Sequence, residues 1–85
     1  MGHSSHYLDR VLFTYSLSHL THSEKIRFYY ALKGRDGKSG VVREYHIRQL
    51  GKTVLLVPSP FDSDVESFLK IWKCSMMKKR VMIEP

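Results

Sequence analysis

Three glycines spaced every third residue, Gly34, Gly37 and Gly40, interrupt the middle of this 85-residue chain. Glycine adopts positive φ angles without steric cost, so this spacing predicts a loop between two helices. Gly34 is expected to end the first helix, Gly37 to lie in a turn and Gly40 to precede the second helix. The same loop can also point backbone amides at an anion, with Arg35 and Lys38 supplying charge between the glycines. The two interpretations are compatible with each other.

Basic side chains gather around this loop. Residues 33–52 contain six of the fourteen Lys and Arg residues and two acidic residues, a net charge of +4, whereas residues 1–32 have a net charge of +1. The whole chain has a formal net charge of +6. Such a charge favours a polyanionic partner, either nucleic acid or an acidic protein surface. A solvated basic face without a ligand is the alternative interpretation.

The composition predicts one small folded domain. Hydrophobic residues make up 42% of the chain and ten residues are aromatic, which is enough to fill one modest core. We expect a single basic domain over residues 7–85 and a flexible N-terminus over residues 1–6. Cys74 is the only cysteine, so it cannot form an internal disulfide, and a reducing, cytoplasmic location is expected. No apolar segment approaches the length of a bilayer span, so no membrane anchor is expected.

Hydrophobic periodicity predicts four helices and one strand. The helices are expected over residues 7–20, 24–33, 40–50 and 63–74, and the strand over residues 53–57. The first two helical segments also alternate between apolar and polar residues, which is the pattern of a strand. The β-branched run closed by Pro58 is the clearest strand, and we expect it in the core.

Capping residues support the predicted helices. Thr21 or Ser23 can cap the helix that begins at Glu24, and Ser39 can cap the next helix, which Gly51 ends. These caps satisfy backbone groups that a helix leaves without partners at its ends.

The C-terminal third contains the best-defined helix. Pro58 to Pro60 is expected to form a rigid extended turn, after which Ser63 and Glu66 have the spacing of a capping box. The buried face of the helix is expected to consist of Val65, Phe68, Leu69 and Trp72. Residues 75–85, which contain Val81-Met82-Ile83, are expected either to form a short pairing strand or to remain a frayed tail.

These elements predict an α+β fold, and two arrangements fit them. In the first, the three N-terminal helices form a helix-turn-helix-like group, and the short β element and the C-terminal helix complete the core. In the second, residues 25–33, 41–50 and 53–57 are three antiparallel strands between two helices. This α-β-β-β-α order resembles double-stranded-RNA-binding domains.

Two short motifs resemble ligand-binding loops of known families. GRDG at residues 34–37, followed by VVRE at residues 41–44, resembles the GXXG loop of KH domains, which clamps the nucleic-acid backbone. The resemblance covers about a dozen residues and lacks the strand pattern of that family, so none of the family's binding residues is assigned to this chain. Gly37-Lys38-Ser39 resembles the end of a P-loop, but Leu32 stands where that motif has glycine. No pair of base and nucleophile and no set of metal ligands is recognisable, so we expect no enzymatic activity, metal or cofactor.

The charge pattern predicts a small, non-catalytic nucleic-acid-binding protein that contacts the phosphate backbone of DNA or RNA. The candidate contact residues are Lys33, Arg35, Lys38, Arg43, Tyr45, Arg48, Lys52, Lys78, Lys79 and Arg80. Tyr45 is the aromatic residue expected to stack on a base. The alternative is an accessory subunit of a larger nucleic-acid-processing enzyme, such as a polymerase complex. Such a subunit would dock through the apolar tail Val81-Met82-Ile83.

Overall fold

The computed structural model describes residues 8–83, so the predicted flexible N-terminus lies outside the described residues. The elements follow in the order β1 (Leu8–Tyr15), α1 (His22–Lys33), α2 (Val41–Glu44), β2 (Arg48–Gly51), β3 (Val54–Pro58), the 3₁₀ turn η2 (Ser59–Phe61), α3 (Asp62–Ile71) and β4 (Met76–Ile83). The predicted α+β class is therefore confirmed.

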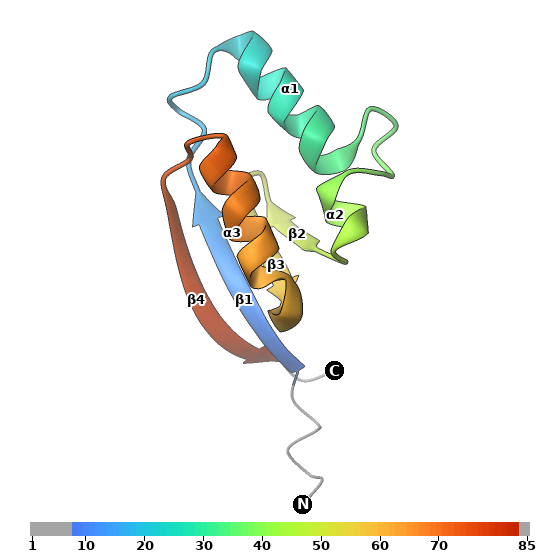
Figure 1. The fold of residues 1–85 in the computed structure, drawn as a ribbon, viewed down its shortest axis with the longest axis vertical. Coiled ribbons are helices and arrows are strands. Elements are labelled where there is room, and N and C mark those ends of the chain that lie inside the picture. Colours follow the sequence, from blue (N-terminus) through green and yellow to red (C-terminus); the bar gives the residue numbers. More distant parts are fainter. Residues whose placement is uncertain (1–7, 84–85) are drawn as a thin grey trace, which may run out of the picture.

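The four strands form one sheet in the spatial order β2-β3-β1-β4, with every neighbouring pair antiparallel. The chain thus runs strand, helix, two hairpin-linked strands, helix, strand. This succession, with the first and third strands in the centre, is the ferredoxin-like or split β-α-β topology. Figure 1 shows α3 along one face of the sheet and α1 near the end of the sheet that is uppermost in this view.

The core lies between this face of the sheet and the two long helices. It contains Val11, Phe13, Tyr15, Leu55 and Val57 from the strands, Phe28 and Leu32 from α1, and Val65 and Leu69 from α3. Phe28 is its aromatic centre, because its ring centroid lies 5.5 to 5.7 Å from the rings of four other aromatic residues. Those neighbours are Tyr15, Tyr29, Phe68 and Trp72. One aromatic side chain therefore joins α1 to both the sheet and α3.

The first segment is the strand β1, so the helix predicted over residues 7–20 is wrong. The alternating residues Val11, Phe13 and Tyr15 are all buried on the helix side of the sheet. β1 pairs with β3 on one edge and with β4 on the other. Because both edges gain hydrogen-bonded partners, tertiary pairing outweighs the helical spacing of the same apolar residues.

The second predicted helix is confirmed as α1, together with its caps. Thr21 accepts a hydrogen bond from the Glu24 amide at 3.2 Å, and the Glu24 carboxylate accepts one from the Thr21 amide at 2.8 Å. This reciprocal pair is a capping box. At the other end, Gly34 has a φ of 79° and donates its amide to the Tyr30 carbonyl. Two local signals therefore fix a helix where the alternation alone was ambiguous.

The third predicted helix, residues 40–50, is wrong beyond its first turn. α2 stops at Glu44, His46 has a φ of 55°, and residues 48–51 form β2 in a hairpin with β3. Ser39 does not cap α2, because its hydroxyl donates to the Asp36 carboxylate at 3.1 Å. Gly51 ends a strand instead of a helix.

Neither predicted arrangement of elements is formed. A helix-turn-helix-like group is missing from residues 8–83, because its first member is a strand and its third is one turn long. The three-strand alternative correctly anticipates a hairpin before β3, but it makes residues 25–33 a strand, and these belong to α1. Pairing of β1 between β3 and β4 replaces both arrangements.

The C-terminal predictions are largely confirmed. The strand predicted over 53–57 is β3, the helix predicted over 63–74 is α3, and the tail pairs with β1 as β4. The predicted face of α3 is buried at Val65 and Leu69, with Phe68 and Trp72 packed against the core. The capping box at the start of α3 is wrong, because Pro58 to Pro60 lead into a 3₁₀ turn that continues into the helix.

Candidate nucleic-acid interface

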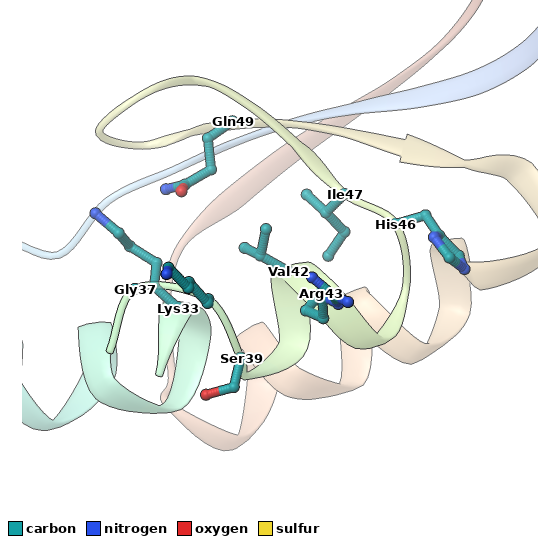
Figure 2. A pocket seen from close by; sticks show the side chains of 9 residues that line it. Lys33, Gly37, Ser39, Val42, Arg43, His46, Ile47 and Gln49 are labelled. Carbon is teal, nitrogen blue, oxygen red and sulfur yellow. The ribbon is translucent and has the colours of Figure 1, made fainter. Parts of the chain in front are cut away.

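An open hollow of about 640 Å³ lies between the end of α1, the loop with the three glycines (residues 34–40, the glycine loop), α2 and β2. It is lined by Lys33, Gly37, Lys38, Ser39, Val42, Arg43, His46, Ile47 and Gln49. Figure 2 shows Gln49 on the strand side and Ser39 and Arg43 on the loop and helix side, with Val42 and Ile47 between them. Three cationic side chains and no carboxylate belong to this lining. The hollow is therefore suited to an anion.

The glycine loop is held by its own backbone. The amide of Gly34 donates to Tyr30, that of Gly37 to Gly34 and that of Ser39 to Lys33, at 2.8, 3.2 and 3.1 Å to the carbonyl oxygens. These bonds satisfy carbonyls at the end of α1. The amide of Lys38 donates to the Asp36 carboxylate at 2.9 Å. These four amides are therefore already bonded within the loop, as expected if the glycines serve to shape the turn between the two helices. The positive charge in the hollow comes from side chains.

At two of the three positions a side chain would meet neighbouring atoms too closely, in addition to the strain of a positive φ. A Cβ atom on Gly40, whose φ is 86°, would lie 2.8 Å from the Ala31 and Leu32 carbonyl oxygens and from the Gly34 amide nitrogen. A Cβ on Gly34 would lie 1.9 Å from the Ser39 hydroxyl. Around Gly37, by contrast, no atom lies within 4 Å of such a Cβ. The loop therefore folds back tightly onto the end of α1.

The cations of the hollow are not neutralised by nearby carboxylates. Within residues 8–83 the ion pairs are those of Lys70 and Lys78 with Glu66 and that of Arg80 with Asp9, and none involves a residue of the hollow. The loop between α1 and α2 contains one carboxylate, that of Asp36. The Lys38 amide and the Ser39 hydroxyl both donate to it and lower its pKa. Its charge is thus turned toward the loop itself.

Three predicted contact residues in or near the hollow are engaged with aromatic rings. The Lys33 ammonium nitrogen lies 5.8 Å from the centroid of the Tyr29 ring. The guanidinium carbon of Arg35 lies 5.0 Å from the centroid of the exposed Tyr30 ring. The ring of Tyr45 lies 5.4 Å from that of Phe61 and packs against the core. Burial, aided by the charges of Glu44 and Asp64, raises the pKa of Tyr45. Arg35 is therefore accessible to a ligand, whereas one side of Tyr45 is occupied.

The remaining predicted residues are spread over three other places. Arg48 and Lys79 lie opposite Leu56 and Leu12, on the sheet face that points away from the helices. Lys52 lies between β2 and β3, and its carbonyl accepts the Tyr15 hydroxyl at 3.1 Å. Lys78 and Arg80 lie on the helix side of β4, in the ion pairs with Glu66 and Asp9 at 2.6 and 2.7 Å. Of the ten predicted residues, only Lys33, Lys38 and Arg43 line the hollow.

Sequence patterns missed the other half of the hollow. His46, Ile47 and Gln49 belong to the chain that leaves α2 and enters β2, a region that the first arrangement makes helical and the second makes a strand. Burial alternates from Ile47 to Gln49 in the folded chain, but the residues themselves, Ile-Arg-Gln-Leu, do not alternate between apolar and polar, so the sequence offers no clear strand signal there.

Three further features of residues 8–83 concern metal ligands, membrane-spanning helices and the single cysteine. No group of three or more His, Cys, Asp or Glu side chains is placed to hold a metal ion in this part of the chain. Within the same range, no helix is both long enough and apolar enough to span a bilayer. Cys74 is buried as a free thiol, and burial raises its pKa, which makes it a weak nucleophile.

Fold and hollow together define a small basic α+β domain of ferredoxin-like topology with an anion-compatible hollow beside the helices. No protein-family model, no curated protein and no solved structure matches the chain. Its function therefore has to be inferred from the fold and from the geometry of the site.

Proposed function

We propose that the protein is a small, non-catalytic nucleic-acid-binding protein that contacts the phosphate backbone of DNA or RNA through the hollow. The observation that carries this proposal is the convergence of Lys33, Lys38 and Arg43, from three successive elements, on one hollow without a lining carboxylate. Phosphate contacts of this kind supply most of the affinity of sequence-independent binding.

The three cations offer complementary contacts to a phosphate chain. Lys33 and Lys38 present compact charges on flexible stems, whereas the Arg43 guanidinium can donate two parallel hydrogen bonds to one phosphate. Gln49 adds an amide that can donate to phosphate or to sugar oxygens. Arg35, stacked on Tyr30 beside the end of α1, extends the basic surface beyond the hollow. A strand of nucleic acid that enters the hollow can therefore continue over α1.

The salt dependence of binding tests this proposal. Fluorescence anisotropy would measure the affinity for single-stranded and duplex DNA and RNA at several salt concentrations. For duplex DNA, each lost phosphate contact is expected to reduce the log–log slope by about 0.9, and for single strands by about 0.7. The variant Lys38→Gln/Arg43→Gln is expected to bind all sequences more weakly and with a shallower slope.

A matched control separates the hollow from net charge. Arg27→Gln/Lys73→Gln removes the same two charges from exposed positions outside the hollow. We expect its binding to remain close to that of the parent chain. A flat salt response of the parent, or equal losses in the two double variants, would exclude the hollow as a phosphate site.

A further inference from the structure

The sheet has a second face, which points away from the helices. On β1 the core residues Val11 and Phe13 alternate with Leu12 and Thr14, so the latter two lie on the opposite face. On β3, Leu56 lies opposite Leu12 and likewise stands outside the core cluster. Among residues 8–83, α1 and α3 both pack on the other side, as Figure 1 shows for α3. This outer face carries no helix from the described chain.

One row of residues across this face has a regular chemical pattern. Arg48 on β2 lies opposite Leu56 on β3, Leu56 opposite Leu12 on β1, and Leu12 opposite Lys79 on β4. The row thus reads cation, aliphatic, aliphatic, cation, with the cations on the two edge strands.

The neighbouring rows differ from this one, because a cation or a polar residue stands on the central strand β1 in each of them. In one of them, Arg10 stands between Pro58 and Val81. In the other, Thr14 stands between Val54 and Met77, whose side chain is 76% exposed. The aliphatic strip therefore comprises Leu12, Leu56 and Val54 on the two central strands, with Arg48 and Lys79 on either side of its leucine row and Arg10 at one end.

Among residues 8–83, the strands place no carboxylate on the outer face. Asp9 is the one acidic residue in the four strands, and it lies on the helix side, 2.7 Å from Arg80. The positive charge of Arg10, Arg48 and Lys79 is thus not offset on their own face. A partner that brings carboxylates to this border would gain complementary charge.

Three other occupants fit this face less well. Single-stranded nucleic acid needs rings on which bases stack, but the aromatic residues of the strands, Phe13 and Tyr15, both belong to the core. A second copy of the chain would oppose cations to cations. Insertion into a lipid surface needs protruding apolar side chains, but the central Leu56 is only 7% exposed, whereas a helix lying on the face can contact the half-buried Leu12 and Val54 beside it.

The dimensions of the strip match one helix. Neighbouring strands lie about 4.8 Å apart, so the edge-strand cations of one row stand roughly 14 Å from each other. A helix is about 10 Å across with its side chains and would cover the two central strands between them. We propose that the outer face of the sheet is a docking site for an amphipathic α-helix of a partner protein, with an aliphatic stripe bordered on both sides by Asp or Glu. This partner is additional to nucleic acid, and its binding does not depend on the hollow.

The probe is a phage-displayed library of helical peptides with a fixed leucine stripe and flanking positions that vary among Glu, Gln and Lys. Selection against the whole chain is expected to enrich Glu on both flanks. The best peptide, made synthetically, should shift the NMR methyl signals of Leu12, Leu56 and Val54 and leave those of the core unchanged. Charge reversal by Arg48→Glu/Lys79→Glu is expected to weaken this peptide by at least about tenfold, because like charges then face each other.

Lys33→Glu/Lys38→Glu makes the same change in net charge at the hollow and serves as the matched variant. We expect it to keep peptide binding and to lose nucleic-acid binding, whereas Arg48→Glu/Lys79→Glu does the reverse. Failure of the nucleic-acid proposal alone would leave the peptide results unchanged. The docking proposal is overturned if Glu is not enriched, if the shifts map to the hollow, or if the reversal at Arg48 and Lys79 leaves the peptide affinity intact. It is equally overturned if that reversal abolishes binding to RNA, to anionic vesicles or to a second copy of the chain while no peptide binds.

Discussion

The hollow and the outer sheet face each carry three cations, yet they present different chemistry between them. Around Lys33, Lys38 and Arg43 lie a polar loop, an imidazole and an amide, together with the aliphatic side chains of Val42 and Ile47. Between Arg48 and Lys79 lie two leucines in register. Both surfaces are therefore positively charged. The polar groups of the hollow favour phosphate, whereas the leucines of the outer face favour an apolar helix flanked by acidic residues. Net charge alone does not distinguish the two partners.

The two surfaces also differ in what holds them in place. The hollow depends on a short loop with three glycines at positive φ and on the four-residue helix α2. The outer face depends on four antiparallel strands, two of them paired on both edges. Short, exposed segments open locally at lower free energy than central strands. Substitutions in the loop should therefore change the hollow alone, whereas the outer face should be lost only with the whole fold.

The largest effect is expected where both surfaces share their support. Phe28→Ala removes a fully buried ring that contacts the sheet, α1 and α3, and should lower the free energy of unfolding by about 3–5 kcal/mol. Binding of nucleic acid and of the helical peptide should then be lost at the same denaturant concentration. Tyr30→Ala in the same helix removes a ring that is 44% exposed, and it should change stability by roughly 0.5 kcal/mol or less. If one surface survived in Phe28→Ala under conditions that abolish the other, they would not share one cooperative unit.

A smaller effect, confined to the hollow, is expected from Gly40→Ala. The new methyl group would meet backbone atoms of α1 at 2.8 Å, so the loop has to move. The positive φ of 86° adds strain, which for a residue with a side chain costs about 1–3 kcal/mol. Nucleic-acid affinity should fall while binding of the helical peptide is retained.

Gly37→Ala is the matched control, since it has a similar φ of 72° and open space around the added methyl. It should show the backbone cost alone, measured by chemical denaturation, and leave the hollow in place. Equal losses of nucleic-acid affinity in the two variants would mean that the close approach at Gly40 does not shape the hollow.

The same contrast between loop and sheet explains how much of the fold was predictable. α1 was predictable because Thr21, Glu24 and Gly34 are local signals that act within a few residues. β3 and α3 carry patterns that only one element fits, and both were predicted. β1 was not predictable, because its residues suit either element and the decision is made by pairing with β3 and β4, more than 35 residues away.

The site was predictable only in part, for the same reason. Lys33, Lys38 and Arg43 lie within eleven residues of each other, and the local glycine pattern sufficed to group them. Gln49 and His46 join them only because the chain turns at His46 and enters a strand. Arg48 and Lys79 share a face only through the register of the whole sheet. Long-range pairing therefore decided which basic residues lie together, and composition does not encode it.

The smallest effect, a response of the loop to acid, would sharpen the contrast further. The Lys38 amide and the Ser39 hydroxyl donate to the Asp36 carboxylate at 2.9 and 3.1 Å, and these bonds lower its pKa below the ordinary value of 3.8. A carboxyl group with a lowered pKa in the folded state stabilises the fold above its unfolded pKa, and this contribution is lost as the pH falls through the folded pKa. Acidification below pH 3.8 should therefore shift the NMR signal of the Lys38 amide, while the amides of Leu12 and Leu56 keep theirs until global unfolding. In Asp36→Asn the side-chain oxygen still accepts from the Lys38 amide but does not titrate in this range, so the shift should disappear. A Lys38 signal that titrates unchanged in Asp36→Asn would show that another group organises the loop, and the hollow would then not depend on Asp36.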